Sequence, residues 1–281
     1  MPSNLSPLRY PGGKTQLYPF VKEILKQNDL LGETYIEPFA GGAGLAIKLL
    51  LNNEVKRIII NDLDFAIYSI WYCILNYTDD FCQKIEDIDV FVNEWDKQRN
   101  IYFSHTESIF DMGFSAFYLN RTNRSGIIKG VMIGGRGQSG TYKINARFNK
   151  DALIEKIKNI AKQKDKIIIT NHDAADFLSG GVLNHYYKTF INFDPPYVIK
   201  GSQLYQNSFT EEDHKALAEL ISKCRRKWMV TYDICPLVEE LYYKFRKAHI
   251  SVNYSASNSG QAKEFVFFSN NVAIPPGIEL L

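Results

Sequence analysis

The 281-residue chain lacks several features that would assign it to a class at once. It has four cysteines without C-x-x-C spacing, which argues against a zinc site and for reduced thiols in a cytosol. No apolar run approaches about 18 residues and no signal peptide is evident, so neither membrane insertion nor secretion is expected. The formal net charge is only +2, so the chain as a whole makes no case for a polyanionic partner. A surface for nucleic acid must therefore be local, and a cytoplasmic location is expected.

What the chain does contain is an alternation of β-forming and helical segments. Strand character is found at 34–36, 57–60, 166–170, 189–193, 228–231, 249–254 and 264–268. Apolar residues at three- and four-residue spacing predict helices over 14–27, 43–51, 64–77, 150–164, 210–223 and 236–247. Strands that alternate with helices imply an α/β fold with a mainly parallel, doubly wound sheet.

The alternation stops between the second and third of these strands. From about residue 64 to residue 164 the pattern indicates helices followed by a Gly-rich loop region, with no strong buried strand. We therefore expect one domain formed by residues 1–63 and 165–281, and a second domain, residues 64–164, inserted into it.

The run Asn192-Phe193-Asp194-Pro195-Pro196-Tyr197 is the most informative motif. It completes an apolar strand, which two consecutive prolines must end. Because prolines lack an N–H and have a fixed φ, the turn is stiff and its carbonyl oxygens face outward as acceptors. Asp194 adds an acceptor, and Tyr197 can stack on a planar ring. The motif predicts a receptor for an amino group on an aromatic base; the alternative is a plain turn that ends a strand.

A glycine-rich turn, residues 37–44, lies between the first strand and the next helix and lets a ligand approach the backbone closely. Ile47 stands where G-x-G-x-x-G would need its third glycine, so classical NAD binding is not favoured. The second strand ends at Asp62, a position from which a carboxylate can accept hydrogen bonds from ribose hydroxyls. The alternative for Asp62 is an N-cap of the following helix.

The segment Gly13-Lys14-Thr15 is similar to the end of a phosphate-binding loop but fails the full pattern, because Leu8 stands where a glycine is required. A lysine at the start of a helix after a glycine turn can instead reach a carboxylate on a ligand. The alternative is a solvated lysine.

Three motifs in this order and spacing carry a family resemblance: Tyr10-Pro11-Gly12-Gly13-Lys14, Glu37-Pro38-Phe39-Ala40-Gly41-Gly42 and Asp194-Pro195-Pro196-Tyr197. With Asn207-Ser208-Phe209, they make the chain resemble, over nearly its whole length, the DNA adenine-N6 methyltransferases of the DNA adenine methylase type, the D12 class. The resemblance implies a seven-stranded, Rossmann-like methyltransferase sheet, S-adenosyl-L-methionine as methyl donor, no metal, and a target-recognition domain where residues 64–164 lie.

The resemblance also implies roles for the motif residues. Tyr10 and Lys14 would contact the donor, Lys14 through the donor's carboxylate, and Asp62 would hold the ribose. Asp173 would accept from the adenine amino group of the donor, although Ala174 replaces the aromatic residue usual after this acid; Asp176-Phe177 is the alternative. The turn beneath the methionine portion, together with the catalytic acid, completes the expected donor site: Glu37, Phe39, Ala40, Gly41 and Asp194.

At the target, an adenine must leave the duplex stack before its N6 can be reached. Tyr197 is the expected stacking partner and Phe209 would cover the other face. Hydrogen bonds from N6 to Asp194 and to the Pro195 carbonyl, on a turn stiffened by Pro196, would aim the nitrogen lone pair at the methyl group. Whether Asp194 is also a general base stays open.

Residues 112–150 contain no acid but seven basic residues, of which Arg121, Arg124 and Arg136 are the predicted DNA contacts. Arg124 and Arg136 are the predicted guanine contacts, and Asn120, Asn123 and Gln138 are available to read base edges. Leu119-Asn120-Arg121 fits the family, whereas residues 142–145 depart from its pattern, so a GATC target is not assumed. The alternative is a solvated basic loop.

The sequence thus predicts a site-specific DNA methyltransferase that acts on N6 of a flipped adenine in double-stranded DNA, as part of restriction-modification or of phage or host DNA marking. A monomer is expected, with a cognate restriction endonuclease as a further partner to consider. Two alternatives remain: methylation of cytosine N4 or another planar amine, and a non-catalytic DNA-binding regulator with the same fold.

Overall fold

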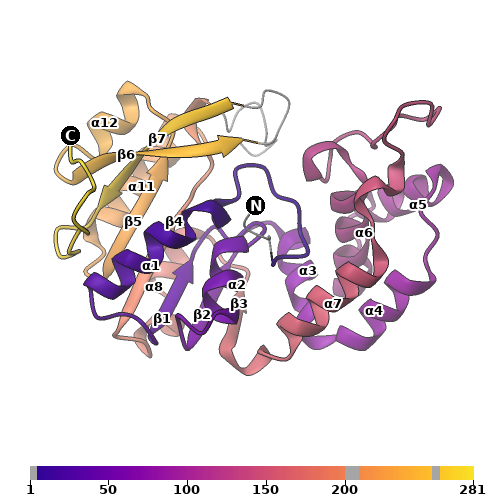
Figure 1. The fold of residues 1–281 in the computed structure, drawn as a ribbon, viewed down its shortest axis with the longest axis horizontal. Helices are drawn as coiled ribbons and strands as arrows, with labels where there is room; N and C mark the ends of the chain where they lie inside the picture. Colours follow the sequence, from indigo (N-terminus) through magenta and orange to yellow (C-terminus); the bar gives the residue numbers. More distant parts are fainter. Residues whose placement is uncertain (1–4, 200–208, 255–259) are drawn as a thin grey trace.

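A computed structural model describes residues 5–199, 209–254 and 260–281. One half of the molecule is a seven-stranded sheet in the order β3-β2-β1-β4-β5-β7-β6, and the other half is a lobe of helices (Figure 1). The strands are β1 Thr34–Glu37, β2 Arg57–Asn61, β3 Ile167–Thr170, β4 Thr189–Phe193, β5 Lys227–Tyr232, β6 Arg246–Tyr254 and β7 Gly260–Phe268. The first five run parallel, while β7 is antiparallel to β5 and to β6. This sheet confirms the predicted α/β fold.

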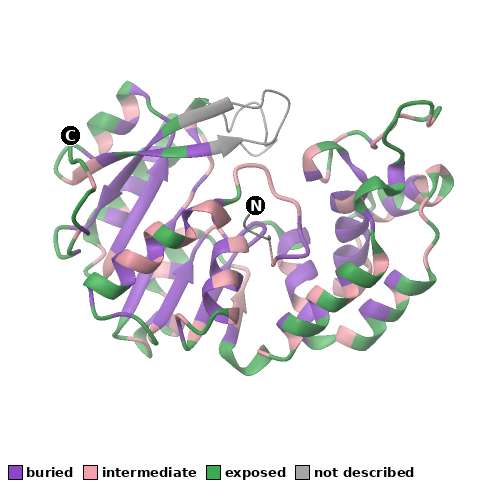
Figure 2. Ribbon diagram, in the orientation of Figure 1, coloured by how far each residue is buried: buried purple, intermediate pink, exposed green. Residues whose placement is uncertain are grey.

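Helices cover both faces of the sheet, as alternation of strands and helices requires. The helical elements of this half are η1 Lys14–Leu17, α1 Tyr18–Gln27, α2 Gly44–Leu51, η4 Lys164–Lys166, α8 Ala174–Ser179, α9 Gly181–Asn184, α11 Glu211–Lys223 and α12 Pro236–Leu241. Alternate strand residues point to opposite faces: Ile58 and Phe190 pack with α1 and α2, whereas Ile59 and Ile191 pack with α8, α11 and α12. Figure 2 shows the central strands β1, β2, β4 and β5 as the most buried layer.

Two of the predicted helices differ from the structure by four residues or more at one end. The helix expected over 14–27 begins with the 3-10 turn η1, and α1 starts only at Tyr18, because Pro19 fits only the first turn of an α-helix. The helix expected over 236–247 ends at Leu241. From Arg246 the chain pairs with β7 over nine residues, and the preceding Phe245 packs its ring 4.8 Å from that of Trp228. Sheet pairing and aromatic burial thus override the helical pattern.

The segment 64–164 is helical, as its pattern indicates. It comprises α3 Phe65–Asn76, α4 Thr78–Asp87, α5 Val92–Phe103, α6 Ile109–Thr122, η2 Arg124–Gly126, η3 Ile144–Arg147 and α7 Lys150–Ala161. The apolar core of this lobe, including Phe114 and Ile157, is continuous with the core on the α2 face of the sheet. The lobe therefore rests on shared packing, and its role as a target-recognition domain stays a prediction. No helix within the described ranges is long and apolar enough to cross a membrane.

Candidate functional site

A pocket of about 580 Å³ lies at the carboxyl ends of the parallel strands. In the sheet, β2 lies on one side of β1 and β4 lies on the other. The chain therefore adds β2 and β3 in one direction from β1 and then β4 and β5 in the other, so the strand order reverses at β1. In open α/β sheets, ligands bind at this kind of switch point. The sheet half contributes residues 8, 10–15, 37–45, 61–63, 172–174, 192, 194–197, 209 and 213 to the lining, and the helical lobe contributes Asp64, Phe65 and Lys129.

The pocket brings together all the sequence-predicted residues of the sheet half. They are Tyr10, Lys14, Glu37, Phe39, Ala40, Gly41, Asp62, Asp173, Asp194, Pro195, Pro196, Tyr197 and Phe209. Asp173 lines the pocket while the alternative Asp176 does not, although Asp173 also caps α8 by accepting a hydrogen bond from the Asp176 N–H at 2.8 Å. Location therefore favours Asp173. Asn207 and Ser208 lie outside the described residues.

The glycine-rich turn is shaped by its contact with Tyr10. A Cβ at Gly41 or Gly42 would lie 2.6 or 2.8 Å from Tyr10 side-chain atoms, so only glycine lets this side chain cover the turn. Gly41 also has a φ of +46°, in the left-handed region. Its carbonyl accepts a hydrogen bond from the Trp71 indole at 3.0 Å, which ties the turn to α3. The turn is thus fixed from both sides.

Asp62 lines the pocket directly after β2 and contacts the glycine-rich turn. Its carboxylate accepts hydrogen bonds from the Gly41 N–H at 2.7 Å and from the Asp64 N–H at 3.0 Å. Burial raises the pKa of Asp62 to about 7, an effect that these two donors oppose. The N-cap of α3 is Asp64, which accepts from the Ala66 N–H, so the alternative that Asp62 caps this helix is wrong.

Glu37 and Asn192 lie side by side at the ends of β1 and β4, since the preceding residues pair in register. Burial raises the pKa of Glu37 to about 8, helped by the negative charge of Asp194 and opposed by the Tyr35 hydroxyl, which lies 3.2 Å away. Both amide atoms of Asn192 are buried without a hydrogen bond of normal geometry, although the amide is near enough to lower the pKa of Glu37. The sequence motifs predict no role for Asn192. A polar residue inside an apolar strand was the available sign that it lies at a site.

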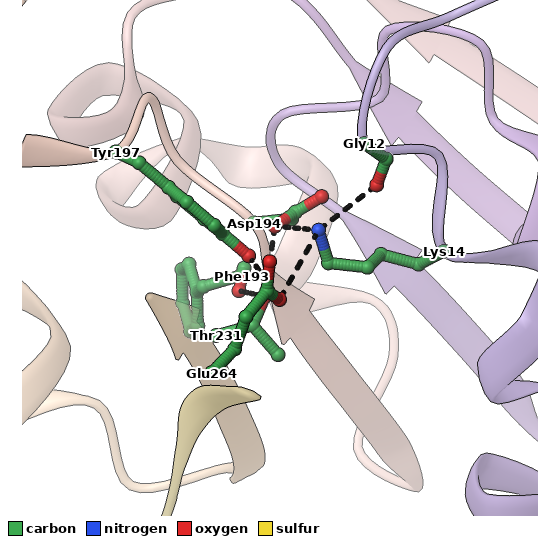
Figure 3. A network of polar contacts seen from close by, with 7 residues as sticks. All are labelled: Gly12, Lys14, Phe193, Asp194, Tyr197, Thr231 and Glu264. Carbon is green, nitrogen blue, oxygen red and sulfur yellow. Dashed lines mark hydrogen bonds and ion pairs between the residues drawn. The ribbon is translucent and has the colours of Figure 1, made fainter. Parts of the chain in front are cut away.

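Asp194 is held by a cation and a hydroxyl (Figure 3). The Lys14 Nζ lies 3.0 Å from Asp194 Oδ1 and donates to the Gly12 carbonyl at 2.9 Å. The Thr231 hydroxyl, from β5, donates to the same Oδ1 at 2.8 Å. These contacts fix one oxygen of the carboxylate, whose side chain remains 24% exposed. Asp194 can therefore present an oxygen to a ligand.

Tyr197 is anchored at both ends. Its hydroxyl donates to Glu264 Oε2, from β7, at 2.7 Å, and Lys14 Nζ lies 4.9 Å from its ring centroid. Asp233 accepts hydrogen bonds from the next two backbone N–H groups, at 3.1 and 2.7 Å. Burial first, then the charges of Asp194 and Glu264, raises the pKa of the Tyr197 phenol, which keeps it neutral.

Sequence reasoning missed Thr231, Asp233 and Glu264, because each acts through a contact with a distant motif. The available signal was polar side chains within or directly after the apolar strands β5 and β7.

Phe209 lines the pocket and contacts the glycine-rich turn through Phe39. Its half-buried ring meets Phe39 edge-on, with the centroids 6.2 Å apart, and lies 5.3 Å from the ring of His214. The position agrees with a cover over a planar ligand, which stays a prediction.

Three amides expected to be available for reading bases are structural instead. Asn120 is fully buried: its Oδ1 accepts from the Arg9 N–H at 2.9 Å and its Nδ2 donates to the Arg9 and Gly126 carbonyls. Asn123 is equally buried and accepts from the Trp95 indole at 2.6 Å. The Gln138 amide bonds to backbone groups of its own loop. Asn120 and Asn123 are thus buried and Gln138 is half-buried, and each holds local backbone in this structure. A DNA contact by Asn120 stays a prediction.

The arginines of the helical lobe differ in their freedom. The Arg121 guanidinium donates to the Pro7 and Arg147 carbonyls, and burial lowers its pKa to about 10, so its first role is to hold the N-terminal segment. Arg136 is exposed and makes a bidentate pair with Asp96 at 3.0 and 2.8 Å. Arg124 is exposed. Guanine contacts by Arg124 and Arg136 stay predictions.

Among the described residues there is no group of three or more His, Cys, Asp or Glu side chains arranged to hold a metal ion. The expectation that no metal is needed stays a prediction.

Comparisons with known proteins agree with the pocket. Residues 10–256 match the family model of the D12 class N6 adenine-specific DNA methyltransferases. The chain is 24% identical to the Type II methyltransferase M.MjaIII of Methanocaldococcus jannaschii, over 73% of each protein, and 22% identical to the DNA adenine methylase of Escherichia coli K12, over 95% of this chain and 94% of that one. Among solved structures, M. capricolum TrmK in complex with S-adenosyl-homocysteine is 8% identical over 89% of this chain and 69% of its own, with a TM-score of 0.36. So remote a likeness adds nothing to the sheet order.

Proposed function

The chain belongs to the D12 class of N6 adenine-specific DNA methyltransferases, and we propose that this pocket receives both the methyl donor and an adenine extruded from duplex DNA. It is a site-specific adenine DNA methyltransferase. The observation that carries the proposal is the convergence of the glycine-rich turn, Asp62 and Asp194 on a single cavity at the strand-order reversal. Membership in this class decides for N6 of adenine over N4 of cytosine.

The donor side of the pocket fits S-adenosyl-L-methionine, which when bound supplies an electrophilic sulfonium methyl group. Glu37, Asp62 and Asp173 offer side-chain oxygens as acceptors for an ammonium, ribose hydroxyls and an adenine amino group. The buried, unbonded amide of Asn192 supports a polar ligand at the same place. Tyr10, with Phe39, Ala40 and Gly41, forms the wall against which the donor lies.

The acceptor side fits a planar amine. Asp194 and the Pro195 carbonyl accept the N6 hydrogen bonds, and Tyr197 and Phe209 stack on the purine faces. Hydrogen bonds from N6–H to fixed acceptors orient the nitrogen lone pair toward the methyl carbon. The Lys14 ammonium holds Asp194 in place. The same ammonium would also contact the carboxylate of the donor, as the family resemblance predicts.

The helical lobe is the proposed DNA-reading unit. Its exposed Arg124, and Arg136 once released from Asp96, would contact guanines, while Lys129 lines the pocket itself. Three further predictions stay predictions: a role in restriction-modification or DNA marking, a partner endonuclease, and a monomeric state.

The test is the substitution Asp194→Asn, which keeps the shape and removes the charge. We expect methyl transfer to DNA to fall by about 100-fold or more, because an acceptor of the N6 proton is weakened where charge develops. DNA binding should change little. The measurement is single-turnover transfer of labelled methyl groups beside a DNA titration.

Asp176→Asn is the matched control, because this exposed acid lies near the pocket without lining it and should transfer at the parent rate. Undiminished transfer by Asp194→Asn would remove the assigned role of the carboxylate.

A further inference from the structure

Glu264 is a buried acid that the pocket does not use directly. It lies on β7 with no exposed surface, directly before the apolar run Phe265-Val266-Phe267-Phe268. Within the described part of the chain, the pocket lining includes Lys14 and Tyr197 but not Glu264. A buried carboxylate is costly unless it is paired and hydrogen-bonded, so its presence in the sheet requires a compensating role.

Its contacts point to the two side chains on which the acceptor side depends. Glu264 Oε2 accepts the Tyr197 hydroxyl at 2.7 Å and lies 3.8 Å from Lys14 Nζ (Figure 3). The same ammonium is 3.0 Å from Asp194 and stands over the Tyr197 ring. Two carboxylates thus share one cation, and the ring is fixed beside it.

The ring of Tyr197 has little freedom elsewhere. Its backbone follows two prolines, and Asp233 holds the next two N–H groups. The ring also packs 5.9 Å from that of Tyr232. The hydroxyl end of the Tyr197 ring is held by its hydrogen bond to Glu264.

We propose that Glu264 is a positioning residue for methyl transfer, which sets the Tyr197 ring for stacking on the extruded adenine and keeps Lys14 beside Asp194. The inference rests on the proposed function of the pocket. It assigns a task to a residue of β7 that contacts two lining residues of the pocket without lining it itself.

The test compares four forms of the protein with the wild type: Glu264→Gln, Glu264→Ala, Tyr197→Phe and the double variant Tyr197→Phe/Glu264→Ala. Glutamine keeps an acceptor for the Tyr197 hydroxyl but loses the charge facing Lys14, and phenylalanine keeps the ring but loses the hydroxyl. We expect Glu264→Ala to slow single-turnover transfer by about 10- to 100-fold, the range for losing a hydrogen bond to a charged group, and glutamine to rescue part of it. The double variant should be no slower than the slower single variant, because both remove one contact.

A second readout follows the base itself. With 2-aminopurine at a position that the wild type methylates, fluorescence reports extrusion, and Glu264→Ala and Tyr197→Phe should reduce it to the same extent. A purely structural role would lower thermal stability without linking the two residues in this way.

Glu54→Gln is the matched control. Glu54 accepts the Tyr18 hydroxyl at 2.8 Å and pairs with Lys22 at 2.6 Å, the same three residue types away from the pocket, and its removal should leave transfer unchanged. Wild-type rates in Glu264→Ala, or rate losses that multiply in the double variant, would overturn the inference. If Glu264→Ala does not fold, the pair Glu264→Gln and Tyr197→Phe decides by the same criteria. A wild type that transfers no methyl group would refute the proposed function itself.

Discussion

At the scale of single residues, the pocket gathers acids of unequal burial: Glu37 is buried, whereas the side chain of Asp194 remains 24% exposed. Asp194 and Tyr197 were predictable because their motif is contiguous and its prolines limit what the backbone can do. Glu264 and Thr231 were not, since only strand pairing brings β5 beside β4 and β7 beside β5. The burial of Asn120 could not be predicted for a related reason. Basic residues follow it in the sequence, but its amide is buried against Arg9.

The raised pKa of Glu37 predicts a pH-dependent stability. The folded protein keeps a proton on Glu37 up to about pH 8, whereas an unperturbed glutamate loses it near 4.5. The folded state therefore binds more protons between these values, and the free energy of unfolding falls as pH rises through this window. Relative to Glu37→Gln, the wild type should lose at most about 1.4 kcal/mol per pH unit.

Urea unfolding of both proteins from pH 5 to pH 8 measures this difference. Glu239→Gln, at a partly exposed acid paired with Lys247, is the control and should follow the wild type. Parallel curves for wild type and Glu37→Gln would show that Glu37 ionises normally in the folded state.

At the scale of elements, the strands were predictable because short apolar, β-branched runs lie in a sheet covered on both faces. Helix ends were less so, because Pro19 and the pairing of β6 with β7 act against the apolar periodicity. The unexpected element is the N-terminal segment 5–13. It links the glycine-rich turn of the sheet, through Tyr10, to α6 and η2 of the helical lobe, through Arg9.

Gly126 predicts how much this link contributes. Its φ is +78°, and a Cβ would lie 2.2 Å from the Arg9 carbonyl oxygen, which is backbone and cannot move aside cheaply. Gly126→Ala should cost about 1–3 kcal/mol of unfolding free energy and weaken donor binding, because Tyr10 and Lys14 follow Arg9 directly.

Gly135→Ala is the matched control, since its φ of +64° is also positive but nothing lies within 4 Å of the added Cβ. It should cost only the backbone strain and leave donor binding unchanged. Equal losses of stability and of donor affinity in the two variants, by urea unfolding and calorimetry, would show that the contact with Arg9 is unimportant.

At the scale of the whole molecule, the small net charge results from acidic and basic residues that lie in different parts of the protein. The sheet half gathers acids at its strand ends, while residues 112–150 of the lobe carry seven basic residues and no acid. The two halves share one apolar core, and Lys129 of the lobe lines the pocket of the sheet. A base extruded from DNA on the lobe would thereby have a short path to Asp194.

The most direct test of this account is the identity of the methylated nucleoside. The wild type is incubated with S-adenosyl-L-methionine carrying a labelled methyl group and with unmethylated duplex DNA, and the DNA is digested and analysed by mass spectrometry. The account predicts label in N6-methyl-2′-deoxyadenosine alone. Label in N4-methylcytosine, or no label from a protein that binds both donor and DNA, would contradict it.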